Sequence, residues 1–118
     1  MQVNILGQSY HVVVKKYADD EAFAKNSIDG YCDWYTKDIV VCDMNTWPGW
    51  EHEPKATVRV SMKQTLRHEI VHAFLYESGL ADSSFAGAGP WAKNEEMVDW
   101  MATQGPKIYC AWKEARAL

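Results

Sequence analysis

The chain has 118 residues, of which 47% are hydrophobic, and no shift in composition divides it, so we expect one compact domain over residues 1–118. The formal net charge is -4 at pH 7 and the lysines and arginines form no basic stripe, so a nucleic-acid partner is not expected. The N-terminal residues show neither segment of a signal peptide, and no apolar run is long enough to cross a bilayer, so we expect neither secretion nor a membrane location.

The strand-rich half of the chain comes first, over residues 1–44. Short runs rich in valine, isoleucine and tyrosine alternate there with turn-forming residues such as glycine and aspartate. The predicted elements are a hairpin of residues 3–6 and 10–15, a short helix over residues 19–26, and a second hairpin of residues 31–34 and 38–42.

The helical half is expected over residues 61–118, after an ordered loop at residues 45–54 that contains two prolines and two tryptophans. A long helix is predicted to begin at Ser61, which is a suitable N-cap residue, and to end at Gly79. A glycine-rich crossing follows over residues 81–90.

Two further helices are predicted after that crossing. The first runs from about Lys93 to Gln104, and Gly105-Pro106 is expected to end it because proline removes a helical hydrogen bond. The second covers residues 107–117, with Pro106 at its first turn.

The three cysteines, Cys32, Cys42 and Cys110, are widely spaced and contain no Cys-x-x-Cys pair. Neither a disulfide framework nor a thiolate zinc cluster is therefore expected, although a bridge between Cys32 and Cys42 is an alternative. Free thiols are typical of a reducing compartment, so we expect a cytoplasmic protein.

The motif HEIVH at residues 68–72 lies well inside the predicted long helix. Residues four apart on a helix lie one turn above each other, so His68 and His72 can bind one metal ion. Glu69 is rotated about a third of a turn from His68, beside the coordination position that water would occupy. The pattern therefore predicts two metal ligands and a general base, rather than a chance grouping.

A third ligand is expected from the next helix, where residues 94–99 read NEEMVD. On a helical wheel Glu95 flanks the apolar face, whereas Glu96 points nearly opposite, so Glu95 is the better candidate and Glu96 the alternative. Asp99 lies one turn beyond Glu95 and can accept the remaining ring N–H of a histidine ligand. An ordinary acidic surface is the other interpretation of these carboxylates.

The stretches TLRHEIVHAFLYESG and WAKNEEMVDWMATQGPKI resemble small zinc peptidases encoded by phages or prophages of Gram-positive bacteria. The wider relatives that they resemble are the gluzincins and the ImmA/IrrE metallopeptidases. In gluzincins HExxH is followed by Asn-Glu-x-x-x-Asp, which corresponds here to Asn94, Glu95 and Asp99. The resemblance implies a zincin-like α+β fold, in which a small, mostly antiparallel sheet packs on the HExxH helix and on a second zinc-ligand helix.

We therefore expect a zinc-dependent metallopeptidase of a bacterial host cell, with Zn²⁺ on His68, His72 and Glu95. Glu69 would act as general base on a zinc-activated water, and the substrate would be a peptide or protein. A regulatory protein partner is also possible, and the sequence does not identify it. By analogy with zincins, the substrate is expected to add as a strand beside residues 38–42. Hydrolysis of a peptide bond also needs a donor that stabilises the oxyanion of the transition state, and three tyrosines are candidates: Tyr35, Tyr76 and Tyr109.

The main alternative is a non-catalytic zinc-binding domain with a regulatory or interaction role. In such a domain a protein side chain, usually a cysteine, closes the fourth coordination position. Zinc hydrolysis of a non-peptide amide ranks last, because the cysteine-containing motif that accompanies HExxH in peptide deformylases is absent from the sequence.

Overall fold

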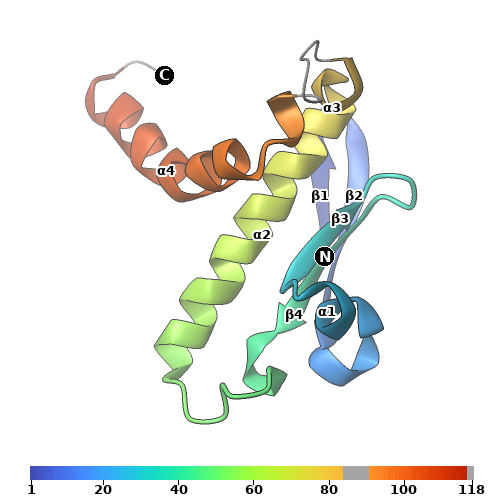
Figure 1. The fold of residues 1–118 in the computed structure, drawn as a ribbon. Coiled ribbons are helices and arrows are strands. Elements are labelled where there is room, and N and C mark those ends of the chain that lie inside the picture. Colours follow the sequence, from blue (N-terminus) through green and yellow to red (C-terminus); the bar gives the residue numbers. More distant parts are fainter. Residues whose placement is uncertain (84–90, 117–118) are drawn as a thin grey trace.

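One four-stranded sheet and a set of helices make up the α+β fold in the computed structural model, which describes residues 1–83 and 91–116 (Figure 1). The strand order in the sheet is β1-β2-β4-β3. The strands are β1 (Gln2–Ile5), β2 (Gln8–Lys16), β3 (Gly30–Asp33) and β4 (Asp38–Asp43).

Both predicted hairpins are present, because β1 pairs antiparallel with β2 and β3 pairs antiparallel with β4. The pairing of β2 with β4 is parallel, which makes the sheet mixed. β4 is therefore an interior strand with hydrogen-bonded neighbours on both sides, and its residues 39–42 are all buried. The expectation that a substrate adds beside residues 38–42 is wrong, because an interior strand has no free edge.

The helices that position the site are α2 (Lys55–Glu77) and α4 (Glu95–Glu114). Figure 1 shows α2 running along one face of the sheet and α4 leading away from the body of the molecule after packing across α2. The shorter helical segments are η1 (Tyr17–Asp19), α1 (Glu21–Asn26), η2 (Met44–Thr46), α3 (Leu80–Ser83) and η3 (Trp91–Lys93). The predicted crossing over residues 81–90 begins inside α3, and its residues 84–90 lie outside the described part of the chain.

The beginning of α2 differs from the prediction, whereas its end agrees with it. The helix begins at Lys55, after Pro54, and not at Ser61. Its additional first turns are stabilised by tertiary packing, because Val58 is buried in a cluster with Phe23, Val40, Cys42 and Met44. Beyond the end of α2, Gly79 has a φ of 81° and its N–H donates to the carbonyl of Tyr76, as expected of a residue that follows a helix C-cap.

The predicted break at Gly105-Pro106 is wrong, since α4 continues through Pro106 to Glu114. Proline has no N–H, so the carbonyl of Ala102, four residues earlier, loses its usual helical donor. The Nε of Arg67 on α2 donates to that carbonyl over 2.9 Å instead. The cost of a proline inside the helix is thereby reduced, which allows the helix to continue.

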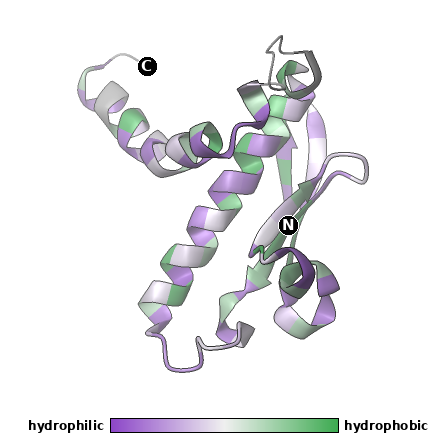
Figure 2. Cartoon of the chain, in the orientation of Figure 1, coloured by the Kyte–Doolittle hydropathy of each residue, from purple (hydrophilic) through white to green (hydrophobic). Residues whose placement is uncertain are grey.

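Most of the buried apolar residues belong to two clusters where α2 packs on the sheet. One is the cluster around Val58, and the other consists of Ile5, Tyr10, Ile39 and Ala73. Hydrophobic and hydrophilic residues are mixed along α2 (Figure 2), and its buried residues include the polar Thr65 and Glu69 as well as Val58 and Ala73. Among the described residues, no helix combines the length and the apolar character that a membrane span requires.

Candidate metal centre

Two polar residues of α2 occupy the sheet-facing stripe between the two apolar clusters. Thr65 and Glu69 are buried there, with Val58 and Ala73 on either side along the same stripe. A buried carboxylate is costly unless it has a partner or a chemical role. The sequence of α2 therefore places an ionisable group at a position where packing alone would favour an apolar residue.

Gly30 at the beginning of β3 allows α2 to approach the sheet at this point. A Cβ atom on Gly30 would lie 2.5 Å from Cγ2 of Thr65 and 2.9 Å from the carbonyl oxygen of Val40. The hydroxyl of Thr65 donates to the carboxylate of Asp29 over 2.8 Å, which joins α2 to the turn that precedes β3. The helix and the strand are thus in direct contact beneath Glu69.

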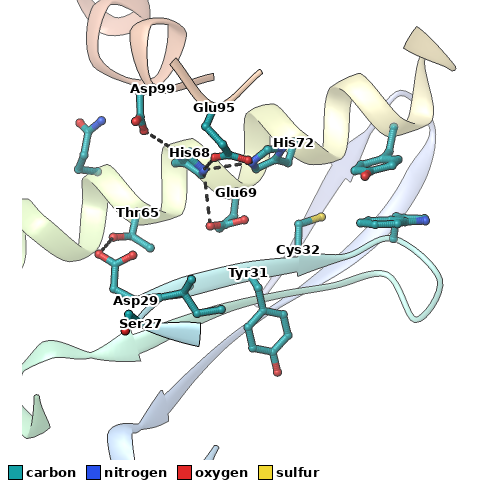
Figure 3. A pocket seen from close by; sticks show the side chains of 15 residues that line it. Ser27, Asp29, Tyr31, Cys32, Thr65, His68, Glu69, His72, Glu95 and Asp99 are labelled. Atoms are coloured by element: carbon teal, nitrogen blue, oxygen red, sulfur yellow. Dashed lines mark hydrogen bonds and ion pairs between the residues drawn. The ribbon is translucent and has the colours of Figure 1, made fainter. Parts of the chain in front are cut away.

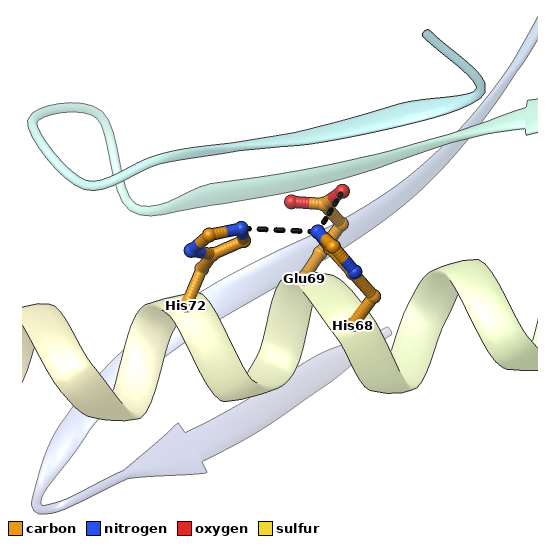
Figure 4. Close-up of side chains that lie close together, drawn as sticks. All are labelled: His68, Glu69 and His72. Atoms are coloured by element: carbon orange, nitrogen blue, oxygen red, sulfur yellow. Dashed lines mark hydrogen bonds and ion pairs between the residues drawn. The ribbon is translucent and has the colours of Figure 1, made fainter. Parts of the chain in front are cut away.

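The rings of His68 and His72 extend from α2 and converge on one point beside the helix (Figure 4). Their Nε2 atoms lie 3.0 Å apart, and Oε1 of Glu69 lies 4.0 Å from Nε2 of His68. One ligand atom from each of these three residues lies within 4.8 Å of the others. The HEIVH motif thus forms a group on one helix that could hold a metal ion.

Glu95 reaches the same point from α4 (Figure 3). Its Oε2 lies 3.0 Å from Nε2 of His68, and its Oε1 lies 3.2 Å from Nε2 of His72. Asn94 helps to place it, because its side chain accepts a hydrogen bond from the N–H of Met97 and so caps the beginning of α4. Glu96 does not line the cavity, in agreement with the helical-wheel expectation.

Asp99 lies behind His68, one turn after Glu95 on α4. Its Oδ1 is 2.6 Å from Nδ1 of His68. A carboxylate accepts hydrogen bonds, so this contact keeps the ring proton on Nδ1 and leaves the lone pair of Nε2 directed at the point where Glu95 and His72 converge. The sequence did not determine which of the two histidines Asp99 would contact, and in the structure it contacts His68.

The arrangement of these groups fits a small divalent cation. The three closest separations among the ring nitrogens and the Glu95 oxygens are 3.0, 3.0 and 3.2 Å. A tetrahedral ion bound at about 2.0–2.1 Å holds its ligand atoms about 3.3 Å apart, which is close to these separations. Two imidazole lone pairs and a carboxylate that converge in this way repel one another unless a cation or a proton lies between them.

Burial raises the pKa of Glu69 to about 7, and the nearby Glu95 carboxylate acts in the same direction against the opposing effect of His68. Burial also lowers the pKa of His72, which favours the neutral imidazole. The neutral ring is the form that binds a metal ion. Glu69 can thus exchange a proton near neutral pH beside a histidine that is ready to act as a ligand.

The residues predicted for the site, His68, Glu69, His72, Glu95 and Asp99, all line one cavity of about 520 Å³. Comparisons with protein-family models, curated proteins and solved structures found no match for this chain. Of the three tyrosine candidates, only Tyr76 lines the cavity, whereas Tyr35 and Tyr109 do not and are exposed.

Sequence reasoning missed the residues of the opposite wall, which come from the turn before β3 and from β3 itself. Asp29, Gly30 and Cys32 line the cavity there. At one end the ring of Trp34 stacks on the ring of Tyr76, with 3.7 Å between the ring centroids. No local pattern signals these residues, because they become part of the site only when β3 packs on α2.

Proposed function

We propose that the protein is a zinc-dependent peptidase. The observation that carries this proposal is the position of Glu95, whose carboxylate spans the Nε2 atoms of His68 and His72 from a second helix at 3.0 and 3.2 Å. Two imidazoles and one carboxylate form the ligand set of many catalytic zinc sites, in which the fourth position is left to water. The hydrogen bond from His68 to Asp99 is the kind of support that such ligands usually have.

Glu69 is the proposed general base. A zinc ion on the two histidines and Glu95 would lower the pKa of a water molecule and polarise the scissile carbonyl. Oε1 of Glu69 lies 4.0 Å from Nε2 of His68, compared with 3.0 Å for Oε2 of Glu95, and this longer distance fits a group that acts on a bound water better than a direct ligand. From there Glu69 can take a proton from that water and return the proton to the leaving amine.

The burial of Glu69 favours a catalytic role over a purely structural zinc site. A structural site needs only its ligands, and a buried carboxylate beside them would add a desolvation cost without any gain. Burial that raises the pKa of Glu69 to about 7 instead suits a group that must gain and lose a proton near neutral pH. We therefore favour a catalytic zinc site over a non-catalytic zinc-binding domain.

The proposed substrate path follows β3 and replaces the expected path along residues 38–42. β3 is an edge strand, and its residues Gly30, Tyr31 and Cys32 line the cavity opposite the histidines. An extended peptide can add to such an edge by main-chain hydrogen bonds. From the resemblance of the two motif stretches, we further propose a phage- or prophage-related role, with a peptide or protein as the substrate.

The decisive experiment compares wild-type protein with Glu69→Gln and with Glu96→Gln. Glu96 is an exposed carboxylate near the site that does not line the cavity, so its substitution is a matched control. We expect Glu69→Gln to bind one zinc ion per chain, as the wild type does, and to lose hydrolysis of a library of quenched fluorescent peptides. Glu96→Gln should retain both properties.

Full peptidase activity in Glu69→Gln would contradict the assignment of the base. A wild-type chain that binds zinc tightly but cleaves no member of the library would instead support the non-catalytic zinc domain. Equal zinc content in wild-type protein and in His72→Ala would rule out the proposed metal site.

A further inference from the structure

The contacts that hold α4 against α2 lie next to the proposed metal site but outside it. Building on the proposed function, we infer that Arg67 is a positioning residue, which holds α4 so that Glu95 and Asp99 lie over the two histidines. Its partner is the carbonyl of Ala102, which Pro106 leaves without a helical donor. The proline inside α4 and the geometry of the metal ligands are thereby connected.

The carbonyl of Ala102 on α4 needs a donor from outside its own helix. In an unbroken helix the carbonyl of Ala102 would accept from the N–H of residue 106, but proline has no N–H. Ala102 is 2% exposed, so water has little access to this carbonyl. A buried carbonyl without a donor is unfavourable, and the Nε of Arg67 meets this need over 2.9 Å.

Further hydrogen bonds orient the side chain of Arg67. Its Nη2 donates to Oε1 of Gln64 over 2.7 Å, and Nε2 of the same amide donates to Oγ1 of Thr103 over 2.9 Å. The side chains of Arg67 and Gln64 on α2 thus form a short hydrogen-bond network with two groups on α4. These groups are the carbonyl of Ala102 and the hydroxyl of Thr103, on successive residues. This network sets the rotation of α4 about its axis as well as its distance from α2.

Two of the residues proposed to form the metal site lie on the same face of α4 as Ala102. Glu95, Asp99 and Ala102 are spaced i, i+4 and i+7, so they lie on one face of α4. On α2, Arg67 directly precedes His68. A rotation of α4 that separated Ala102 from Arg67 would therefore also turn Glu95 and Asp99 away from the histidines.

The apolar packing of α4 is too limited to set this geometry alone. Val98 and Ala102 are its buried hydrophobic residues among those described, whereas Trp100 and Met101 are 58% and 46% exposed. The side chains of Glu95 and Asp99 are also largely exposed. The polar network around Arg67 consequently has a large share in the placement of the helix.

Zinc affinity, measured by competition with a chromophoric chelator, tests this inference without requiring peptidase activity. We expect Arg67→Met to weaken zinc binding roughly tenfold, at the lower end of the effect of losing a group bonded directly to a metal ligand, because Arg67 acts through the placement of Glu95 and Asp99. Arg59→Met is the matched control, because Arg59 is an exposed residue of the same helix, and it should bind zinc as the wild type does. Arg67→Lys retains a donor and should restore part of the affinity.

The zinc affinities of double variants distinguish a role of Arg67 in placing Glu95 from a general loss of stability. Arg67→Met should add little to the effect of Glu95→Gln, because Arg67 acts through Glu95. It should also have a smaller effect in a Pro106→Ala background, where residue 106 can again donate to Ala102. In the cobalt-substituted protein, Arg67→Met should shift the visible spectrum in the direction that Glu95→Gln does.

Equal zinc affinities of Arg67→Met and wild type, or fully additive effects with Glu95→Gln, would overturn the inference. If the wild type bound no zinc at all, the proposed function would fail. Hydrogen exchange in the metal-free protein would still test whether the contact of Arg67 with Ala102 holds α4 against α2. Faster exchange in Arg67→Met at the amides of residues 97–105 would support the role of Arg67 in holding α4. Unchanged exchange at these amides would contradict it.

Discussion

Asp99 on α4 accepts a hydrogen bond from Nδ1 of His68 on α2 over 2.6 Å, across 31 positions of sequence. This contact fixes which nitrogen of His68 carries the proton, and it directs Nε2 toward His72 and Glu95. Because the two residues belong to different helices, the state of the histidine depends on how α4 packs. The proposed metal site is therefore a property of the helix pair and not of the HEIVH motif alone.

Asp99→Asn is expected to weaken zinc binding roughly tenfold, because an amide orients the ring less strongly than a carboxylate and does not raise its basicity. Zinc affinity measured by chelator competition checks this expectation. The protein should stay folded, since the side chain of Asp99 is 63% exposed. An affinity equal to that of the wild type would show that Asp99 does not support the histidine.

Gly30→Ala is expected to lower the free energy of unfolding by about 1–3 kcal/mol, since the new Cβ would meet Thr65 and the carbonyl oxygen of Val40. Urea denaturation measures the change. Adding Thr65→Ser should recover part of the loss, because serine lacks the Cγ2 atom that lies 2.5 Å from the new Cβ but retains the hydroxyl.

The control for this substitution is Gly105→Ala. No atom lies within 4 Å of a Cβ at Gly105, and the residue is helical, so alanine there should stabilise the protein by at most about 1 kcal/mol. Equal destabilisation by the two substitutions would mean that close contact between α2 and β3 is not the reason for glycine at position 30.

Asp20 gives the stability of the protein a predictable dependence on pH. Hydrogen bonds from Tyr31 and Lys15 lower the pKa of its carboxyl group from 3.8 to about 2. A lowered pKa in the folded state stabilises the protein fully above the unfolded value of 3.8, and this contribution is lost as the pH falls through about 2. Asp20→Asn should therefore unfold with a free energy lower by about 2 kcal/mol near neutral pH.

The difference between wild type and Asp20→Asn should fall to roughly half at about pH 3, as measured by urea denaturation. Asparagine is also a good N-cap, so the cap of α1 is expected to persist in the variant. Asp19→Asn, at the exposed neighbouring position, serves as the control and should change little. A difference that stayed constant from neutral pH to about pH 3 would contradict the role of the Asp20 charge.

The three cysteines are free, as predicted, and they should differ in reactivity. Burial raises the pKa of Cys32 to about 12 and that of Cys42 to about 11, whereas Cys110 is exposed. The thiolate is the reactive form, so one thiol per folded chain should react rapidly with a disulfide reagent at neutral pH. Cys110→Ser should abolish this fast phase, and persistence of the phase would contradict the assignment.

Much of the local structure could be predicted because its causes are local. The two hairpins follow from short β-rich runs separated by turn residues, and Gly79 marks the end of α2 because it adopts a positive φ. The beginning of α2 at Lys55 could not be predicted, because the burial of Val58 against Phe23 and Met44 outweighs the capping preference of Ser61. The continuity of α4 through Pro106 depends likewise on a donor from another helix.

The sequence by itself determined that His68, Glu69 and His72 share one region of a helix, because the helical repeat brings residues four apart together. It also ranked Glu95 above Glu96 by the direction of the apolar face. Only the tertiary structure decided that β3, and not β4, is the edge beside the cavity, and that Asp99 meets His68 rather than His72. These outcomes depend on strand order and on the rotation of α4, which arise from contacts between residues far apart in the chain.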